Sequence, residues 1–159
     1  MILEPLPNVA VSRMIGLLEY LEDLGGHADL FRLAERLNMK YGDLAETVRG
    51  ASLLGWVETP HGDVALNEAG KAFLAHDVNA RKRSLREALK RLQTFQFLGR
   101  LLEQAPGRAM PKGGVLEEIV VYLPYENPKQ VLKTVVDWGR YAELIGYSAD
   151  RDELYLDQA

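Results

Sequence analysis

The chain has 159 residues, of which 47% are hydrophobic and 26% are charged, and its formal net charge is −4. This composition is ordinary for a globular protein with one domain or two small ones, and the negative charge argues against a protein that coats nucleic acid, because phosphate contacts supply most of that affinity. The absence of cysteine excludes disulfides, thiolate metal sites and a cysteine nucleophile.

The first half of the chain predicts an extended arm, four helices and one β-hairpin. Pro5 and Pro7 indicate an arm over residues 1–8. The third helix is expected to begin with a capping box formed by Asp43 and Glu46, and Asn67 is expected to cap the fourth helix. From apolar spacing and turn residues, the helices are expected at 9–24, 29–38, 43–54 and 67–74, and the hairpin at 56–66. Three helices followed by a hairpin is the order of a winged helix, a relative of the helix-turn-helix.

The second half predicts a similar series that follows one long helix. Pro106 ends that long helix. Asn127 followed by Pro128 indicates the N-cap and the first residue of a later helix, which is expected to end near Gly146. The helices are therefore expected at 77–106, 112–123 and 127–146, and the closing hairpin at 147–156.

Two stretches of the sequence are nearly alike. The residues LLGW at 53–56 align with LIGY at 144–147. The strands that follow align at Val64 with Leu154 and at Leu66 with Leu156. Because each stretch would end a helix and open a hairpin, the pair predicts two units of one kind. The alternative is that Leu-Leu-Gly-aromatic is a common junction between a helix and a strand.

The expected fold class is mainly α with short β-hairpins (α+β), built as tandem winged-helix units joined by a long helix. The expected boundaries are a linker or arm at 1–8, a first winged-helix unit at 9–76, a long connecting helix at 77–106 and a second winged-helix unit at 107–159.

The sequence offers no set of residues that is typical of catalysis. His27, His61 and His76 each stand alone at a predicted helix edge or turn, with no second histidine or carboxylate at metal-ligand spacing. No phosphate-binding loop, dinucleotide-binding glycine pattern or nucleophile elbow is present. We therefore expect no catalytic, cofactor-binding or metal-binding residues and no cofactor.

DNA binding is the alternative function that a winged helix suggests. The third helix of the first unit would present two acids against Arg49 alone, which is poor for a polyanion. The corresponding helix of the second unit carries Lys129, Lys133 and Arg140, with one acid among them. Nucleic acid is therefore the less favoured partner, and a winged-helix DNA-binding transcriptional regulator stays open as the alternative.

One strongly basic segment lies within the predicted long helix. Lys82, Arg86 and Lys90 recur every fourth residue and form a stripe on one face. This stripe is either neutralised by acids of neighbouring helices or used to dock an acidic or phosphate-bearing partner. Aromatic residues crowd the second unit, either as core residues or as interface anchors. The candidate interaction surface consists of Arg81, Lys82, Arg83, Arg86, Lys90, Arg91, Trp138, Arg140 and Tyr141.

Several stretches together resemble a known family. They are PLPNVAVSRMIGLLEYLEDLGGHADLFRLAERL, LLGWVETPHGDVALNEAGKAF, NARKRSLREAL and VVDWGRYAELIGYSADRDELYL. In combination they are similar to the C-terminal AAA-associated domain that follows the ATP-binding cassette of nitrate/sulfonate/taurine-type ABC importers. The resemblance covers nearly the whole chain, although none of its pieces is a catalytic signature.

The resemblance implies a non-catalytic, regulatory domain that works through protein–protein contacts. ATP hydrolysis would belong to an ATP-binding cassette, which this sequence does not contain, so the chain is expected to be a fragment or a free-standing relative. The implied partner is that cassette, in the same or another chain, with a homodimer as a further expected assembly. The implied location is the cytoplasm, peripheral to the inner membrane, which the domain would reach only through the transporter. A sensor of a small ligand, such as the transported anion, is a third hypothesis.

Overall fold

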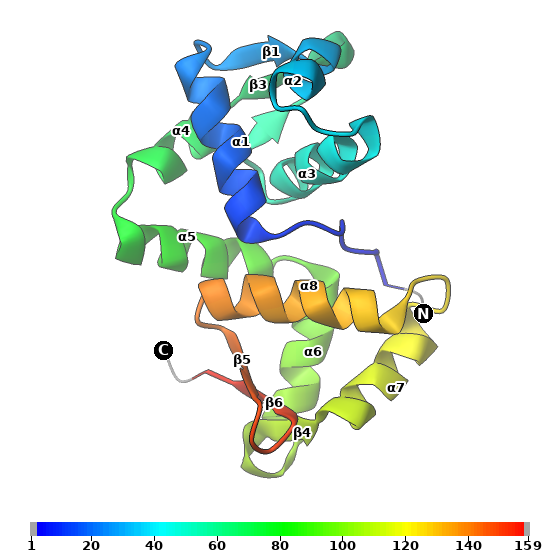
Figure 1. Cartoon of the computed structure of the whole chain (residues 1–159). Helices are drawn as coiled ribbons and strands as arrows, with labels where there is room; N and C mark the ends of the chain where they lie inside the picture. Colours follow the sequence, from blue (N-terminus) through cyan, green and yellow to red (C-terminus); the bar gives the residue numbers. More distant parts are fainter. Residues whose placement is uncertain (1–2, 158–159) are drawn as a thin grey trace. The chain divides into compact units, whose positions relative to one another are not determined.

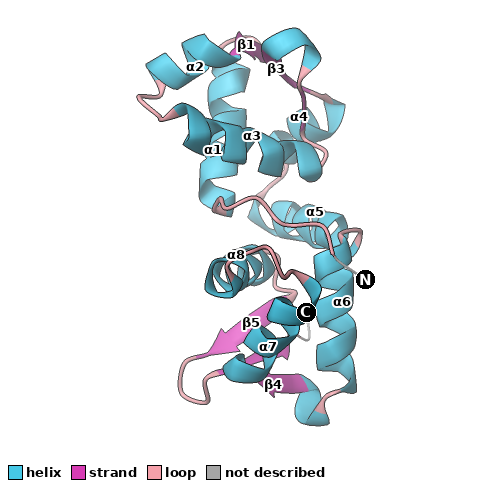
Figure 2. Ribbon diagram, turned by 90° about the vertical axis from the view of Figure 1, so that its right-hand side faces the viewer, coloured by secondary structure: helices cyan, strands magenta, loops and turns pink. Residues whose placement is uncertain are grey.

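The computed structural model describes residues 3–157, which are mostly helical and include two small antiparallel sheets (Figures 1 and 2). The chain folds as two compact units. The N-terminal unit is Pro7–Arg81. The C-terminal unit combines the segment that ends at Leu6 with the chain from Lys82 onward. The α+β class is thus confirmed.

The N-terminal unit contains four α-helices and one three-stranded sheet among its described residues. The strand order is β1-β3-β2, and both pairings are antiparallel. The elements are α1 (Val11–Asp23), β1 (His27–Asp29), α2 (Leu30–Arg36), α3 (Tyr41–Leu53), β2 (Val57–Glu58), η1 (Pro60–Gly62), β3 (Asp63–Leu66) and α4 (Glu68–Ala75).

The C-terminal unit repeats this order. Its sheet has the order β4-β6-β5, again antiparallel throughout. The elements are α5 (Val78–Lys90), whose first residues belong to the N-terminal unit, α6 (Gln93–Gln104), η2 (Pro106–Arg108), β4 (Ala109–Pro111), α7 (Lys112–Tyr122), α8 (Pro128–Tyr141), β5 (Ile145–Ser148) and β6 (Glu153–Leu156). From α6 onward the series is helix, strand, two helices and hairpin, as it is from α1 to β3.

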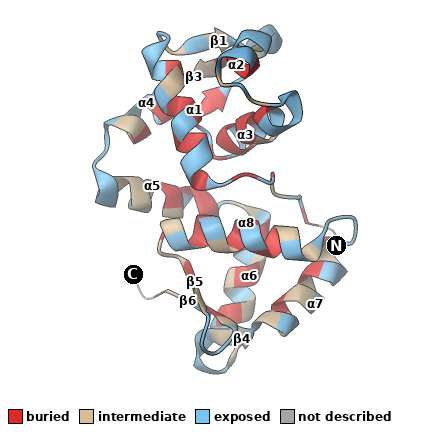
Figure 3. Ribbon diagram, in the orientation of Figure 1, coloured by how far each residue is buried: buried red, intermediate tan, exposed pale blue. Residues whose placement is uncertain are grey.

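Each unit has its own core, visible in Figure 3 as buried residues on the inward side of its helices. In the N-terminal unit, Trp56 packs on Phe73 with ring centroids 4.2 Å apart. In the C-terminal unit, Trp138 is fully buried and stacks on Phe95 at 6.4 Å. Burial of large apolar and aromatic side chains is the main stabilising contribution to such cores.

Both units end their third helix with the same hydrogen bond. The amide of Trp56 donates to the carbonyl of Ala51 at 2.9 Å, and the amide of Leu144 donates to the carbonyl of Gly139 at 2.9 Å. This bond spans five residues and is typical of a Schellman helix end. Trp56 and Leu144 therefore occupy equivalent positions, and α3 can be compared with α8 residue by residue.

This equivalence corrects the alignment expected from the sequence. The left-handed residue after each helix is Gly55 (φ 82°) in one unit and Glu143 (φ 54°) in the other. Gly146, expected to match Gly55 and to end the helix, instead lies within β5, because α8 ends at Tyr141. The expected alignment of the second strands agrees with the register, in which Leu66 and Leu156 each lie opposite the first residue of the preceding strand.

The long helix expected over residues 77–106 is wrong, because α5 and α6 are separate helices. Leu92 breaks the helix by adopting an extended conformation (φ −88°, ψ 134°). The side-chain amide of Gln96 donates at 3.0 Å to the carbonyl of Lys90, one of the carbonyls that the break leaves without a helical partner. Because of the break, the apolar faces of both helices are buried in the core, as Leu89 of α5 and Phe95 of α6 show.

The capping box expected at residues 43–46 is also wrong. The N-cap of α3 is Lys40, and Asp43 lies in the first helical turn. The carboxylate of Glu46 accepts instead from the amide of Asn8 at 2.8 Å and pairs with Arg49. The other two expected caps are confirmed at the helices that begin after Asn67 and Asn127, whose side chains accept from first-turn amides.

The N-terminal arm is attached to the C-terminal unit and does not behave as a free linker. Leu3 is buried, and its amide donates to the carbonyl of Tyr122 at 2.9 Å. The carbonyl of Glu4 accepts from the hydroxyl of Thr94 at 3.1 Å. Residues 1–2 of the expected arm lie outside the described residues.

Candidate interaction surface

Two cations of the basic segment are already engaged within the C-terminal unit. The ammonium group of Lys82 lies 2.7 Å from a carboxylate oxygen of Glu143. The guanidinium of Arg86 donates from Nε to the carbonyl of Ala142 at 2.9 Å and lies 3.8 Å from the same carboxylate. The hydrogen bond and charge of Lys82 lower the pKa of Glu143, with a smaller contribution from Arg86. Lys82 and Arg86 thus hold the end of α8.

Arg81 is engaged in the N-terminal unit. Its guanidinium donates to the carbonyls of Phe73 and Leu74, at 3.2 Å and 2.9 Å, and lies 5.4 Å from the centroid of the Phe73 ring. Cations near the C-terminal end of a helix are favourable because that end carries partial negative charge. Arg81 therefore caps α4.

The remaining candidates differ widely in exposure. Arg83, Arg91 and Arg140 are exposed, and so is Lys90, which lies 3.5 Å from Glu87 on its own helix. Tyr141 is half-buried. Trp138 is fully buried and therefore forms no part of the surface of the folded unit. Of the two interpretations of the basic stripe, the structure favours contacts within the protein for Lys82 and Arg86. Docking of a partner by the exposed cations stays a prediction.

A second cationic feature lies between the start of α7, the outer side of α8 and β5. It is a pocket of about 280 Å³, which we call the lysine pocket. Its charged lining, which we call the rim, consists of Lys112, Lys129 and Lys133. Its remaining lining, which we call the floor, consists of Leu132, Val136 and Tyr147. Sequence reasoning identified Lys129 and Lys133 on one helix but missed Lys112, because only the fold brings α7 and α8 together.

The hydroxyl of Tyr147 points to the turn of the closing hairpin. It lies 2.5 Å from a carboxylate oxygen of Asp152. That hydrogen bond, with desolvation and the charge of Asp152, raises the pKa of Tyr147. The phenol is therefore held neutral, with its ring against the pocket and its polar end turned to Asp152.

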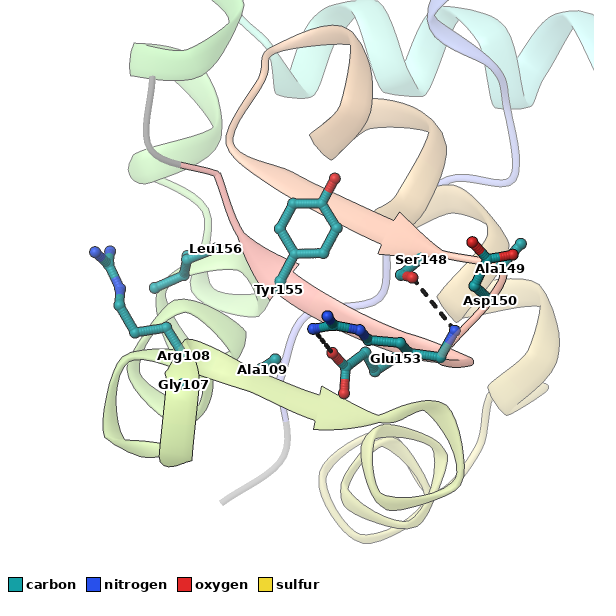
Figure 4. A pocket seen from close by; sticks show the side chains of 10 residues that line it. Gly107, Arg108, Ala109, Ser148, Ala149, Asp150, Glu153, Tyr155 and Leu156 are labelled. Carbon is teal, nitrogen blue, oxygen red and sulfur yellow. Dashed lines mark hydrogen bonds and ion pairs between the residues drawn. The ribbon is translucent and has the colours of Figure 1, made fainter.

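A hollow of larger volume, about 600 Å³, lies along the sheet of the C-terminal unit. Figure 4 shows Tyr155 in its middle, with Arg108 on one side and Asp150 on the other. A Cβ at Gly146 would lie 2.2 Å from the Tyr155 ring, so only a glycine allows the ring to lie on the neighbouring strand. Arg151 is paired with Glu153 at 3.7 Å. This ion pair accounts for two of the charged side chains that line the hollow.

One of the three histidines pairs with an acidic side chain, a contact that the sequence did not predict. Nε2 of His27 lies 2.7 Å from a carboxylate oxygen of Asp63, across the β1-β3 pairing and 36 residues away in sequence. His61 and His76 are exposed. Within residues 3–157, no cluster of three or more histidine, cysteine or acidic side chains is placed to hold a metal ion. In the same part of the chain, no helix has both the length and the apolar character needed to cross a membrane.

Comparison with known families gives one match, to the C-terminal AAA-associated domain, over residues 31–148. The match covers more than half of the chain, begins in α2 and ends with β5, so it includes parts of both units. Searches of curated proteins and of solved structures found no match.

Proposed function

Since the chain belongs to the family of C-terminal AAA-associated domains, we propose that it is a non-catalytic accessory domain of an ABC importer ATPase of the nitrate/sulfonate/taurine type. The family match carries the accessory role. The importer type rests on the resemblance of the sequence stretches from PLPNVAV to the closing DELYL. The domain would act in the cytoplasm by contact with the ATP-binding cassette, and would reach the membrane only through the transporter.

We further propose that both units are winged helices arranged in tandem. Each unit has the order helix, strand, helix, helix and hairpin, and each sheet places the second hairpin strand in the middle. That order and sheet are typical of a winged helix. A winged helix can also serve protein contacts, because its hairpin and third helix project from a rigid core.

The exposed cations of the C-terminal unit are the proposed contact with the cassette. Arg83, Lys90 and Arg91 remain exposed after Lys82 and Arg86 have been used inside the unit. Arginine is enriched at protein interfaces, where its planar group can pair with carboxylates.

The test is to measure ATP hydrolysis and transport by the intact parent protein with and without this segment. We expect its removal to change the hydrolysis rate or the coupling of hydrolysis to transport. A triple charge reversal of Arg83, Lys90 and Arg91 to Glu should reproduce part of that change. Reversal of Lys40 and Lys71, exposed on the N-terminal unit, serves as the control. Unchanged rate, coupling and assembly after deletion would contradict the regulatory role.

DNA binding is a second candidate because α8, the helix that would enter a DNA groove, carries Lys129, Lys133 and Arg140. Opposing it are the acids of the hairpin turn, Asp150 and Asp152, and the net charge of −4. If the chain binds DNA, its affinity should fall steeply as the salt concentration rises, because binding releases counterions from the phosphates. Absence of binding to duplex DNA at low salt would remove this candidate.

A further inference from the structure

We propose that the lysine pocket binds an acidic peptide segment that carries an apolar side chain between its carboxylates. The apolar side chain would occupy the floor formed by Leu132, Val136 and Tyr147, and the carboxylates would meet the three ammonium groups on the rim. This inference adds a binding site to the proposed docking function. Only the identity of the protein that contributes the segment rests on that proposed function.

The three charges of the lysine pocket have no acidic partner in the part of the chain that the structure describes. Among the described residues, none of the ammonium groups of Lys112, Lys129 and Lys133 forms an ion pair with a carboxylate within 4.0 Å. The nearby acid Asp152 accepts from the Tyr147 hydroxyl and, through its backbone carbonyl, from the Lys112 amide. The pocket is therefore a concentration of positive charge on a chain whose net charge is negative.

The placement of these lysines is unfavourable for the stability of the fold itself. Lys112 and Lys129 lie in the first turns of α7 and α8, where the helix dipole disfavours a cation. Lys129 and Lys133 are also spaced by four residues, so like charges repel along one helix face. Charges that cost stability and gain no partner inside the unit are typical of a binding surface.

The N-terminal unit has no lysine at the three positions that correspond to those of the lysine pocket. With Trp56 equivalent to Leu144, Lys129 and Lys133 of α8 correspond to Tyr41 and Ala45 of α3. Through the β1-β3 and β4-β6 pairings, Lys112 corresponds to Leu30. The fold therefore does not require lysine at any of the three positions.

The chemistry of the pocket favours a peptide over a phosphate group. Three of the backbone amides at these helix starts are occupied and do not face a ligand: Asn127 accepts from the amides of Lys129 and Gln130, and the Lys112 amide donates to the carbonyl of Asp152. The three lysines offer flexible ammonium groups, which can meet carboxylates on different residues of a peptide. The apolar floor gains binding energy from an aliphatic or aromatic side chain, which a nucleic-acid backbone lacks.

The test uses the full chain and three fluorescent peptides, with binding followed by anisotropy at low ionic strength. The first peptide carries a central Leu flanked by Glu, the second replaces the Leu with Ser, and the third replaces each Glu with Gln. We expect saturable binding of the first peptide and at least tenfold weaker binding of the other two. The amide NMR signals of Leu132, Val136 and Tyr147 and the methyl signals of Leu132 and Val136 should shift on addition of the first peptide.

The test variant is Lys129→Glu with Lys133→Glu, and we expect it to bind the first peptide at least tenfold more weakly. The control, Lys40→Glu with Lys71→Glu, makes the same change in net charge on the N-terminal unit and should leave the affinity unchanged. The milder pair Lys129→Gln with Lys133→Gln covers the case in which charge reversal prevents folding, and it should weaken binding in the same direction.

Three outcomes would overturn the inference. They are absence of saturable binding of the first peptide, equal affinity of the wild-type chain and the folded lysine variants, and displacement of the peptide by duplex DNA or inorganic phosphate that binds more tightly. The ATPase measurement separates this inference from the proposed function. If the peptide binds but deletion of the segment changes neither ATP hydrolysis nor transport, the regulatory role is contradicted and the proposed binding site is not.

Discussion

The guanidinium of Arg86 donates a hydrogen bond of 2.9 Å to the backbone carbonyl of Ala142, the C-cap residue of α8. Only 17% of the Arg86 side chain is exposed, so this bond is largely shielded from water. The same guanidinium approaches Glu143, whose left-handed backbone turns the chain from α8 into β5. Arg86 therefore fixes the place where the closing hairpin leaves the helix.

Replacement of Arg86 by Met should lower the free energy of unfolding of the C-terminal unit by about 1.5–3 kcal/mol, the cost typical of losing a hydrogen bond from a charged group. The measurement is the urea midpoint followed by circular dichroism. Arg83→Met is the matched control, because Arg83 is exposed on the same helix, and its effect should stay within about 0.5 kcal/mol. Equal effects of the two substitutions would show that the contact to Ala142 contributes nothing.

The ion pair between Glu143 and Lys82 should make stability depend on pH in the acid range. The lowered pKa means that the folded state binds the proton less well than the unfolded state, in which the carboxyl has its ordinary value of 4.5. The stabilisation is therefore fully present above that value and is lost as the pH falls through the lowered pKa. At neutral pH we expect the melting temperature of the wild type to be higher than that of Glu143→Gln. This difference in melting temperature should decrease as the pH is lowered. A difference in melting temperature that increases as the pH is lowered would contradict this pH dependence.

Gly70 should be intolerant of any side chain. A Cβ at this position would lie 2.2 Å from the carbonyl oxygen of Trp56 and 2.7 Å from Leu66. Because the first obstacle is backbone, Gly70→Ala should destabilise the N-terminal unit by about 1–3 kcal/mol. Gly16→Ala in α1, where no atom lies within 4 Å, should instead stabilise it by about 0.5–1 kcal/mol. Thermal melts of the two variants should shift in opposite directions.

Asn67 joins α4 to the preceding helix end through both ends of its amide group. Its oxygen accepts from the amide of Gly70 at 2.8 Å, and its nitrogen donates to the carbonyl of Gly55 at 2.9 Å. Asn67→Ala should cost about 1–2 kcal/mol. Asn67→Asp keeps the cap and loses the donor, so its melting temperature should fall between those of wild type and the Ala variant. An Asp variant as unstable as the Ala variant would show that the bond to Gly55 dominates.

Most helices and both hairpins could be predicted from apolar spacing and from two N-caps, because these signals are local. β1 and β4 could not, since each has three residues and exists only through its pairing with a distant strand. The break at Leu92 was hidden for a similar reason. The apolar spacing continues through it, and the groups that compensate for it, such as Gln96, act only in the folded state.

The candidate surface was harder to predict than the fold. The sequence identified the basic segment, but the partners of Lys82 and Arg86 lie about sixty residues further along the chain. Trp138 looked like an interface anchor because buried and exposed aromatic residues have the same helical spacing. Lys112 carried no local signal at all. A charge pattern shows which residues could bind, and only tertiary contacts show which of them are still free.

The chain has two tryptophans, and each core holds one of them: Trp56 against Phe73 and Trp138 against Phe95. The molecule thus contains an intrinsic optical probe for each half. With Trp138→Phe the remaining emission would come from the N-terminal half alone, and with Trp56→Phe from the C-terminal half alone. Comparing the two denaturation curves would reveal whether the halves lose their structure in one concerted step or one after the other.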